Sequence, residues 1–162
     1  MLVVFASGVG GASLSARHAR SQTTSNQTRN TVGRVNKSNE EWRRLLTAPQ
    51  FHVMRERGTE RPYSGKYNDF KGKGTYVCAG CGLSLFSSAT KFDSGTGWPS
   101  FYAPIAKTHI GTEKDDSAGE TRTEVHCARC GAHLGHVFTD GPRPTGLRYC
   151  MNSVALEFKN KR

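Results

Sequence analysis

The chain has 162 residues, of which 35% are hydrophobic and 18 are glycine, and its formal charge is +10. This length supports one domain with a modest core, which would gain from a metal or another cross-link. Residues 1–37 hold five basic residues and no acid, so the rest of the chain carries only +5. Acids and bases are interspersed there, so we expect no nucleic-acid partner.

Residues 1–37 are rich in serine, threonine and arginine and lack aspartate and glutamate. This composition is typical of an organelle transit peptide, although a disordered tail or an unused upstream start codon would also fit. The many hydroxyl residues and the absence of a clear amphipathic arginine helix favour a plastid over a mitochondrion. If the segment is no signal, we expect a cytoplasmic protein. No apolar run is long enough to cross a membrane, so we expect no membrane partner.

The folded domain is predicted to span residues 38–162. Ser38 and Glu41 have the spacing of a capping box, which starts a helix by satisfying free backbone N–H groups. The sequence places three apolar residues on one face of this helix: Trp42, Leu45 and Leu46.

A second short helix is predicted from about Pro49 to Arg57, with Gly58 as its stop. Residues 58–74 are polar and rich in glycine, which is typical of a loop. Tyr63 and Tyr67 are the expected anchors of this loop.

From Thr75 onward the pattern is one of short strands separated by glycine or proline. We therefore expect a mainly β fold with short N-terminal helices. Residues 109–120 are polar and acidic and are predicted to form an exposed excursion, whereas residues 141–146 form a stiff turn. The predicted strands are Thr75–Val77, Leu83–Phe86, Thr121–Cys127, His136–Thr139, Leu147–Asn152 and Ala155–Phe158.

Four of the five cysteines form two C-x-x-C pairs, each followed by glycine. Two intervening residues let both thiolates face one metal, so the pairs predict a tetrahedral zinc site. The 45 residues between the pairs exceed the spacing of a compact zinc ribbon, so the site would join two distant parts of the domain. A redox dithiol or two structural disulfides are competing interpretations. The predicted ligands are Cys78, Cys81, Cys127 and Cys130.

Cys150 stands alone. A lone cysteine is most often a small buried hydrophobe, and the residues alone leave this reading level with a catalytic one. Arg148 would lie on the same face of a strand and would lower the thiol pKa from about 8.5 toward neutrality. Asn152 would share that face and could offer its amide to an oxygen.

His133 and His136 precede this cysteine, and either could be an ordinary surface or packed residue. Their pairing raises the odds of a catalytic role modestly. Trp98 lies between glycine and proline on a constrained loop. It is expected either to pack in the core or to form an apolar wall for a small ligand.

Taken together, these residues resemble the B-type methionine sulfoxide reductases, and the likeness runs from about Ser38 to Phe158. Six motifs in the same order make the resemblance specific. They are Cys78-x-x-Cys81, Gly97-Trp98-Pro99-Ser100-Phe101, Cys127-x-x-Cys130, His133-Leu134-Gly135-His136-Val137-Phe138, Gly141-Pro142-x-Pro144-Thr145-Gly146 and Arg148-Tyr149-Cys150-x-Asn152-Ser153.

The resemblance implies a fold of two antiparallel β-sheets, with one structural Zn²⁺ remote from the active site. It also implies the reaction, which is reduction of the R epimer of methionine sulfoxide in oxidised proteins or as the free amino acid. Such an enzyme would repair oxidative damage. It implies Cys150 as nucleophile and His136 as proton donor. His133, Asn152 and Arg148 would orient the oxygen and stabilise charge, and Trp98 would pack on the substrate methyl group.

Many members of that family have a resolving cysteine where this chain has Thr96. The chain therefore resembles the one-cysteine subtype, in which an external thiol completes the reaction. Thioredoxin, or glutaredoxin with glutathione, is the expected reductant, and we expect the enzyme to act as a monomer.

Two other classes of protein compete with this assignment. A non-enzymatic zinc module that binds nucleic acid or unfolded protein would not need Cys150 together with Arg148 and His136. A thiol–disulfide oxidoreductase would use the C-x-x-C pairs, but the chain shows no βαβ pattern to support one.

Overall fold

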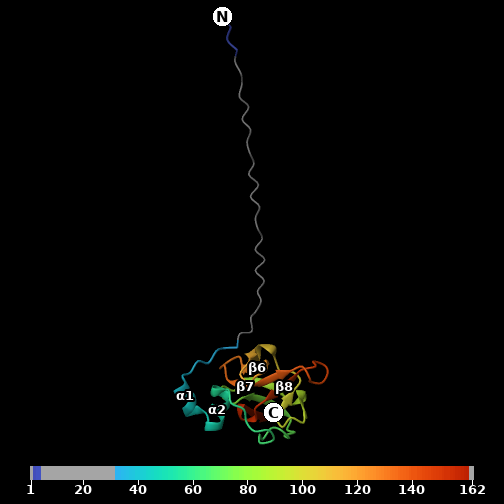
Figure 1. Cartoon of the computed structure of the whole chain (residues 1–162). Coiled ribbons are helices and arrows are strands. Elements are labelled where there is room, and N and C mark those ends of the chain that lie inside the picture. The colour runs from blue at the N-terminus through green and yellow to red at the C-terminus, as the bar shows by residue number, and fades with distance from the viewer. Residues whose placement is uncertain (1, 5–31, 161–162) are drawn as a thin grey trace.

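A computed structural model describes residues 2–4 and 32–160, which form two antiparallel sheets preceded by two short helices (Figure 1). The predicted segment 1–37 lies mostly outside the described residues. Within it, Val32 and Val35 pack against the core, and the Val35 N–H donates to the carbonyl of Arg129 at 2.8 Å.

Helix α1 spans Asn39–Leu45 and begins with the predicted capping box between Ser38 and Glu41. Trp42 and Leu46 are buried, as expected. Leu45 is 60% exposed, so its predicted place on the buried face is wrong. A helix of two turns contacts the domain along one row of residues spaced by four, and Leu45 lies beside that row.

Helix α2 spans Ala48–Glu56 and is capped by Thr47, one residue earlier than predicted. It ends because Arg57, rather than Gly58, adopts the left-handed conformation, with φ 59°. In the loop that follows, Tyr67 is buried among aromatic rings as predicted. Tyr63 is 68% exposed and anchors the loop by hydrogen bonds, since its hydroxyl donates to the Gly95 carbonyl at 2.6 Å and its backbone N–H to the Gly97 carbonyl at 2.7 Å.

The smaller sheet has the strand order β2-β1-β9. Both of its contacts are antiparallel, and β1 is the central strand. These strands correspond to three of the predicted ones, with ends that differ by one or two residues. Their bounds are Gly74–Cys78 for β1, Ser84–Ser87 for β2 and Leu156–Asn160 for β9.

The larger sheet has the order β3-β4-β8-β7-β6-β5, and β6, β7 and β8 lie side by side at the centre of Figure 1. Three of its strands were predicted, although β7 begins three residues before the expected start. The bounds are Lys91–Phe92 for β3, Ser100–Phe101 for β4, Ile110–Asp115 for β5, Arg122–Cys127 for β6, His133–Phe138 for β7 and Arg148–Met151 for β8.

The prediction of an exposed excursion over residues 109–120 is wrong for its first half. Residues Ile110–Asp115 form the edge strand β5, which pairs with β6 along its whole length. The polar composition that suggested a loop reflects an edge position, where side chains meet solvent and the strand is protected from further pairing.

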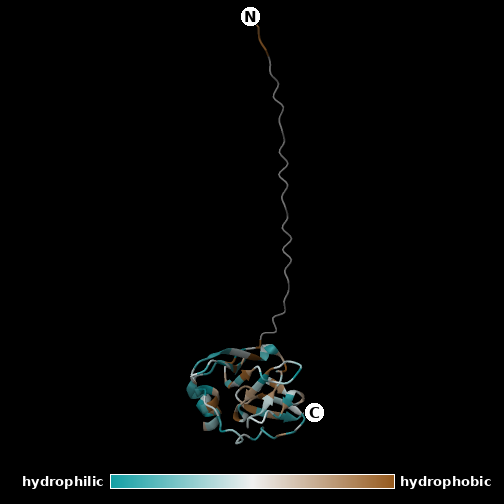
Figure 2. Cartoon of the chain, turned by 45° about the vertical axis from the view of Figure 1, so that its right-hand side comes forward, coloured by the Kyte–Doolittle hydropathy of each residue, from teal (hydrophilic) through white to brown (hydrophobic). Residues whose placement is uncertain are grey.

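Aromatic side chains join the two sheets. Phe101 of β4 stacks on Phe86 of β2 at 4.5 Å between ring centroids and meets Tyr76 of β1 edge-on at 5.0 Å. All three rings are fully buried. Apolar segments accordingly gather on the strands inside the domain, whereas the outer loops are hydrophilic (Figure 2). The predicted mainly β fold with short helices is confirmed.

Among the residues that the structure describes, none of the helices has the length and apolar character needed to span a bilayer.

Candidate active site

Cys150 lies on β8, an inner strand of the larger sheet, where its neighbours are fixed by strand pairing. Ser100 of β4 is opposite it on one side and His136 of β7 on the other. Directly opposed residues of antiparallel strands share a face, so Cys150 and His136 point to the same side. There they line a cavity of about 170 Å³ together with Trp98. We refer to it as the Cys150 cavity.

A β-bulge in β7 places two histidines on this one face. Residues three apart on a regular strand point to opposite faces. Here Val125 is opposite Gly135 while His126 is opposite His133, so β7 carries one extra residue and His133 returns to the face of His136. The ring centroids of His133 and His136 are 5.4 Å apart.

The bulge requires glycine. Gly135 has φ 155°, and a Cβ at this position would lie 2.1 Å from the backbone oxygen of Cys150. Any side chain would therefore push β7 away from the strand that carries the nucleophile candidate.

His136 is held by Asp115 of the edge strand β5, which is held in turn by Arg122 of β6. Its Nε2 lies 2.6 Å from Oδ2 of Asp115, and the same oxygen accepts from the Arg122 guanidinium at 2.8 Å. The side chains of His136 and Asp115 are only 11% and 12% exposed. Arg122 lines the Cys150 cavity with His136, so the cavity has a cationic group on one wall.

His133 is placed differently. It is 3% exposed, and its Nδ1 donates to Oε1 of Glu124 at 2.8 Å, a carboxylate that also meets Arg57. Burial lowers the pKa of His133, although Glu124 opposes the shift. Its Nε2 is buried and has no hydrogen-bond partner among the described residues. His133 is not part of the cavity lining.

The thiol of Cys150 is bordered by hydroxyl groups. Oγ1 of Thr96 lies 3.9 Å from Sγ, and Ser94 joins Thr96 to Ser100 through two contacts of 2.8 Å. Burial raises the pKa of the Cys150 thiol, whereas the Thr96 hydroxyl and the charge of Arg148 lower it by smaller amounts. The predicted net decrease of this pKa is therefore wrong, because the sequence pattern could not show how deeply the thiol is buried.

Arg148 shares the face of Cys150, as predicted, but its guanidinium is engaged elsewhere. It donates two hydrogen bonds to the Asp140 carboxylate, at 2.9 and 2.8 Å, and lies 4.3 Å from the centre of the Phe138 ring. Asp140 raises the pKa of Arg148 further, so the charge is permanent. Arg148 influences Cys150 through its charge rather than as part of the cavity wall.

Trp98 and Asn152 both line the cavity, and both are held by Glu60 of the loop after α2. The Trp98 indole N–H donates to the Glu60 carbonyl at 3.2 Å, and the Glu60 N–H donates to Oδ1 of Asn152 at 3.0 Å. The Glu60 carboxylate accepts from the backbone N–H groups of Ser153 and Val154. The Asn152 amide also donates to the Leu134 carbonyl at 3.1 Å.

Sequence analysis did not find Asp115, Arg122, Glu60 or Phe138 as site residues. Asp115 and Glu60 lie in polar segments that were predicted to be loops, and no local spacing connects them to Cys150. Residues 110–115 show no alternation of apolar and polar side chains, so no local signal pointed to a strand that could deliver Asp115 to the site.

The four remaining cysteines form a second cluster. Their sulfur atoms lie within 4.8 Å of one another, and two contacts measure 3.7 Å (Cys78 to Cys130) and 3.6 Å (Cys81 to Cys127). Four sulfurs at about 2.3 Å from a tetrahedral ion would be about 3.8 Å apart. Hydrogen bonds with Cys127 and the other two cysteines raise the pKa of Cys78 and lower that of Cys81. The donor set therefore fits a metal ion, and the five cysteines are free of disulfides.

The cluster links the two sheets. Cys78 ends β1 of the smaller sheet and Cys127 ends β6 of the larger one, whereas Arg122 at the other end of β6 lines the Cys150 cavity. A six-residue strand separates its ends by roughly 17 Å. The metal cluster and the cavity are thus distinct sites.

A single thiol in a small, mainly apolar cavity, on a scaffold joined by a four-cysteine cluster that could hold a metal ion, is typical of a cysteine-dependent oxidoreductase. The SelR domain model matches residues 46–160. The chain is 57% identical over 135 residues to the peptide methionine sulfoxide reductase MsrB of Bradyrhizobium diazoefficiens, a match covering 83% of this chain and 97% of the relative. The MsrB of Pseudomonas putida is 60% identical over 126 residues (78% and 95%), and that of Methanosarcina barkeri is 58% identical over 127 (78% and 89%). The chain belongs to the SelR-domain family, the B-type methionine sulfoxide reductases.

Proposed function

We propose that the protein reduces the R epimer of methionine sulfoxide, in oxidised proteins or as the free amino acid, and so repairs oxidative damage. The observation that carries the proposal is the arrangement of Cys150 and His136 directly opposite each other in one cavity, beside the aromatic wall of Trp98. Family membership supports the substrate class, and reductases of this kind are divided by epimer.

The reaction begins at Cys150. Its sulfur attacks the sulfoxide sulfur while the sulfoxide oxygen takes up a proton, and the oxygen then passes to the cysteine as the S–O bond of the substrate breaks. Methionine leaves, and Cys150 remains as a sulfenic acid. The substrate sulfur gains two electrons and the cysteine sulfur loses two.

His136 supplies the proton in this scheme. It lines the cavity, whereas His133 does not. His133 is also kept neutral by burial and has its Nδ1–H committed to Glu124, so its Nε2 can only accept. We therefore assign His133 to shaping the face behind His136.

The remaining residues act on the substrate by position and charge. Asn152 retains one amide hydrogen beyond its bond to Leu134, which allows it to orient the oxygen. The fixed charge of Arg148 stabilises negative charge that develops near Cys150. Trp98 packs against the substrate methyl group.

An external thiol then completes the cycle. One thiol converts the sulfenic acid to a mixed disulfide with release of water, and a second thiol restores Cys150. Thr96 occupies the position next to the nucleophile, and the other four cysteines are engaged in the metal cluster. Thioredoxin, or glutaredoxin with glutathione, is the proposed donor, with the enzyme acting as a monomer.

The metal that we propose for the four-cysteine cluster is one structural Zn²⁺, held by Cys78, Cys81, Cys127 and Cys130. Four thiolates in tetrahedral spacing are the ligand set of structural zinc. When bound, the ion would offset part of the charge of the thiolates and cross-link the two sheets.

We further propose that residues 1–37 direct the protein to a plastid. The hydroxyl-rich, acid-free composition supports this localisation. Fusion of residues 1–37 to a fluorescent protein tests it, since plastid import is expected and mitochondrial or cytoplasmic fluorescence would contradict it.

Separated R and S sulfoxides, with dithiothreitol as reductant, test the activity. We expect turnover of the R epimer alone and loss of at least about 1,000-fold in kcat for Cys150→Ser, because the nucleophile is removed. The variant should keep its thermal unfolding midpoint and metal content. Turnover of the S epimer alone, or retained activity of C150S, would overturn the proposal.

A further inference from the structure

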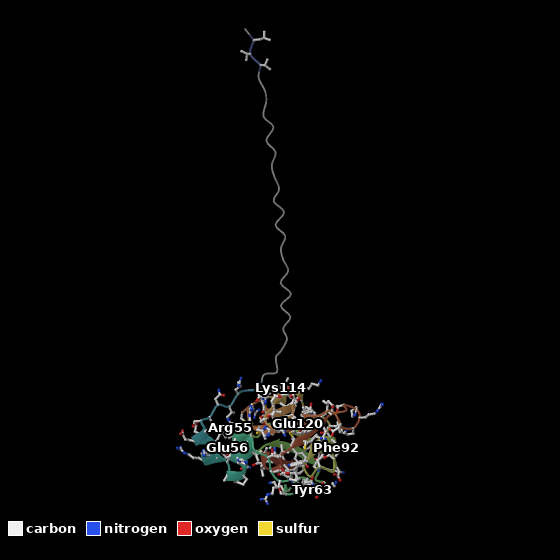
Figure 3. All side chains as sticks on the ribbon, viewed as in Figure 1. Arg55, Glu56, Tyr63, Phe92, Lys114 and Glu120 are labelled. Carbon is white, nitrogen blue, oxygen red and sulfur yellow. The ribbon has the colours of Figure 1, made fainter. Side chains whose placement is uncertain are left out.

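The edge strand β5 reaches the active site through one side chain. Asp115, its last residue, lies opposite Arg122 of β6, and its carboxylate extends to His136 one strand further in. Figure 3 labels Lys114, the chain neighbour of Asp115, at the top of the domain and Tyr63 at the bottom. Asp115 itself does not line the Cys150 cavity, so any effect on the reaction must pass through His136 or Arg122.

The contact decides which nitrogen of His136 meets the substrate. Because a carboxylate only accepts hydrogen bonds, Nε2 must carry the hydrogen toward Asp115. The nitrogen that remains for the cavity is Nδ1. After Nδ1 has given its proton to the sulfoxide oxygen, the neutral ring keeps its Nε2–H on Asp115, so the ring does not need to rotate between protonation states.

We propose that Asp115 is a positioning residue for catalysis, which keeps a hydrogen on Nε2 of His136 both before and after proton transfer, directs Nδ1 at the sulfoxide oxygen and keeps Arg122 on the same wall. This inference rests on the proposed role of His136 as proton donor. The inference adds an acidic residue to the Cys150–His136 pair. This residue lies on β5, a strand that was not predicted from the sequence.

Both carboxylate oxygens of Asp115 are held by hydrogen bonds. Oδ2 accepts from Arg122 and meets His136, while Oδ1 accepts from the backbone N–H and the hydroxyl of Ser117, at 3.0 and 2.6 Å. Hydrogen bonds from the Ser117 hydroxyl and from His136 hold the pKa of Asp115 well below its usual range. The group therefore stays ionised and acts by orienting the ring, without taking the proton.

A purely structural role is the competing explanation, in which Asp115 only ties β5 to the sheet. Backbone pairing already joins β5 to β6 at six positions, from Ile110 opposite Cys127 to Asp115 opposite Arg122. The hydrogen bond between Asp115 and His136 joins β5 to β7 across β6. Pairing of β5 with β6 therefore does not need it.

A double-mutant cycle in the full chain separates the two roles. Asp115→Ala is expected to lower kcat by about 100-fold, within the range of general acid catalysis, with KM changed less than about twofold. Asp115→Asn retains an acceptor oxygen for the Nε2–H and should lose only about tenfold. In the His136→Gln background, Asp115→Ala should change kcat by less than about twofold, because its effect passes through the missing ring.

Asp116→Asn is the matched control, since it alters a neighbouring carboxylate that binds Lys114 and Thr121 outside the site. Its kcat should equal that of the parent. ¹⁵N NMR of labelled histidine, recorded at alkaline pH so that the neutral tautomer is observed and assigned by difference from H136Q, should show the hydrogen on Nε2 in the parent and in D115N. In D115A this preference should be lost.

The outcomes distinguish the inference from the proposed function. An equal loss from D115A in both backgrounds, or an unchanged tautomer in D115A, would refute the positioning role while leaving the reaction intact. If H136Q alone keeps full kcat, both the proton-donor assignment and the role of Asp115 fail. Should D115A not fold, the D115N spectrum and its cycle with H136Q decide the same question.

Discussion

The pKa of the Cys150 thiol is shifted in opposite directions by its surroundings. Burial raises its pKa, and the nearby Thr96 hydroxyl and Arg148 charge lower it less strongly. A group with a raised pKa is mostly a thiol in the free enzyme at neutral pH, so reactivity depends on the few groups that favour the thiolate.

We expect alkylation of Cys150 by iodoacetamide to keep accelerating as the pH rises beyond about 8.5, the ordinary thiol value. Arg148→Gln removes the stabilising charge, so it should slow the reaction at pH 8 by about three- to tenfold. Arg143→Gln, in the exposed turn, should have no effect. A rate that levels off below pH 8 in the parent would contradict the raised pKa.

In the proposed cycle, Thr96 is the reason why an external thiol must complete the reaction. Its hydroxyl lies 3.9 Å from the Cys150 sulfur, so Thr96→Cys would place a thiol close to the nucleophile. After one turnover without reductant, we expect the parent to gain one oxygen in mass and T96C to lose two hydrogens by forming an internal disulfide. Ser94→Cys, which introduces a thiol elsewhere in the same loop, is the control whose mass change is compared with that of T96C. An internal disulfide in the parent would refute the need for an external thiol.

At the scale of elements, the bulge in β7 is the feature that assembles the two histidines. Gly135→Ala should destabilise the domain by about 2–4 kcal/mol, because the new Cβ meets the Cys150 carbonyl and the backbone conformation disfavours a side chain. Urea denaturation measures the change. Gly33→Ala, which meets no atom within 4 Å, should stay within about 0.5 kcal/mol. Equal effects of the two substitutions would show that the bulge tolerates a side chain.

The elements that sequence could predict are those with a strong local signal. The capping residues of α1 favour a helix, and the β-branched and aromatic residues of β1, β6 and β8, in segments near glycine or proline, favour strands. Strands β3 and β4 have two residues each and owe their existence to pairing with distant neighbours, so no local periodicity could reveal them.

The same holds for the site: residues within local motifs could be predicted from the sequence, whereas residues that depend on distant contacts could not. Cys150, His136 and Trp98 stand in recognisable motifs, and the structure brings all three to one cavity. Asp115 and Glu60 act at sequence distances of 21 and 92 residues from their partners His136 and Asn152. Such contacts depend on strand order and loop path, which a single sequence does not display.

For the whole molecule, the four-cysteine cluster is the cross-link between the sheets. Cys81→Ser should abolish tight metal binding and lower the thermal midpoint by more than about 10 °C, because a structural zinc site contributes several kcal/mol. Calorimetry with metal analysis provides the measurement, and C150S is the control with an unchanged midpoint. A C81S protein as stable as the parent would show that the sheets hold together without the ion.

The size of the Cys150 cavity also orders the events of a catalytic cycle. A space of about 170 Å³ accommodates one amino-acid side chain at a time. In the proposed cycle, the oxidised methionine and the reducing thiol must both reach the Cys150 sulfur in this cavity, so they exclude each other. Methionine therefore has to leave before a reductant can bind. The enzyme stays in its oxidised form between these two binding events. Kinetically, this predicts a ping-pong mechanism with competition between substrate and reductant at high concentration of either.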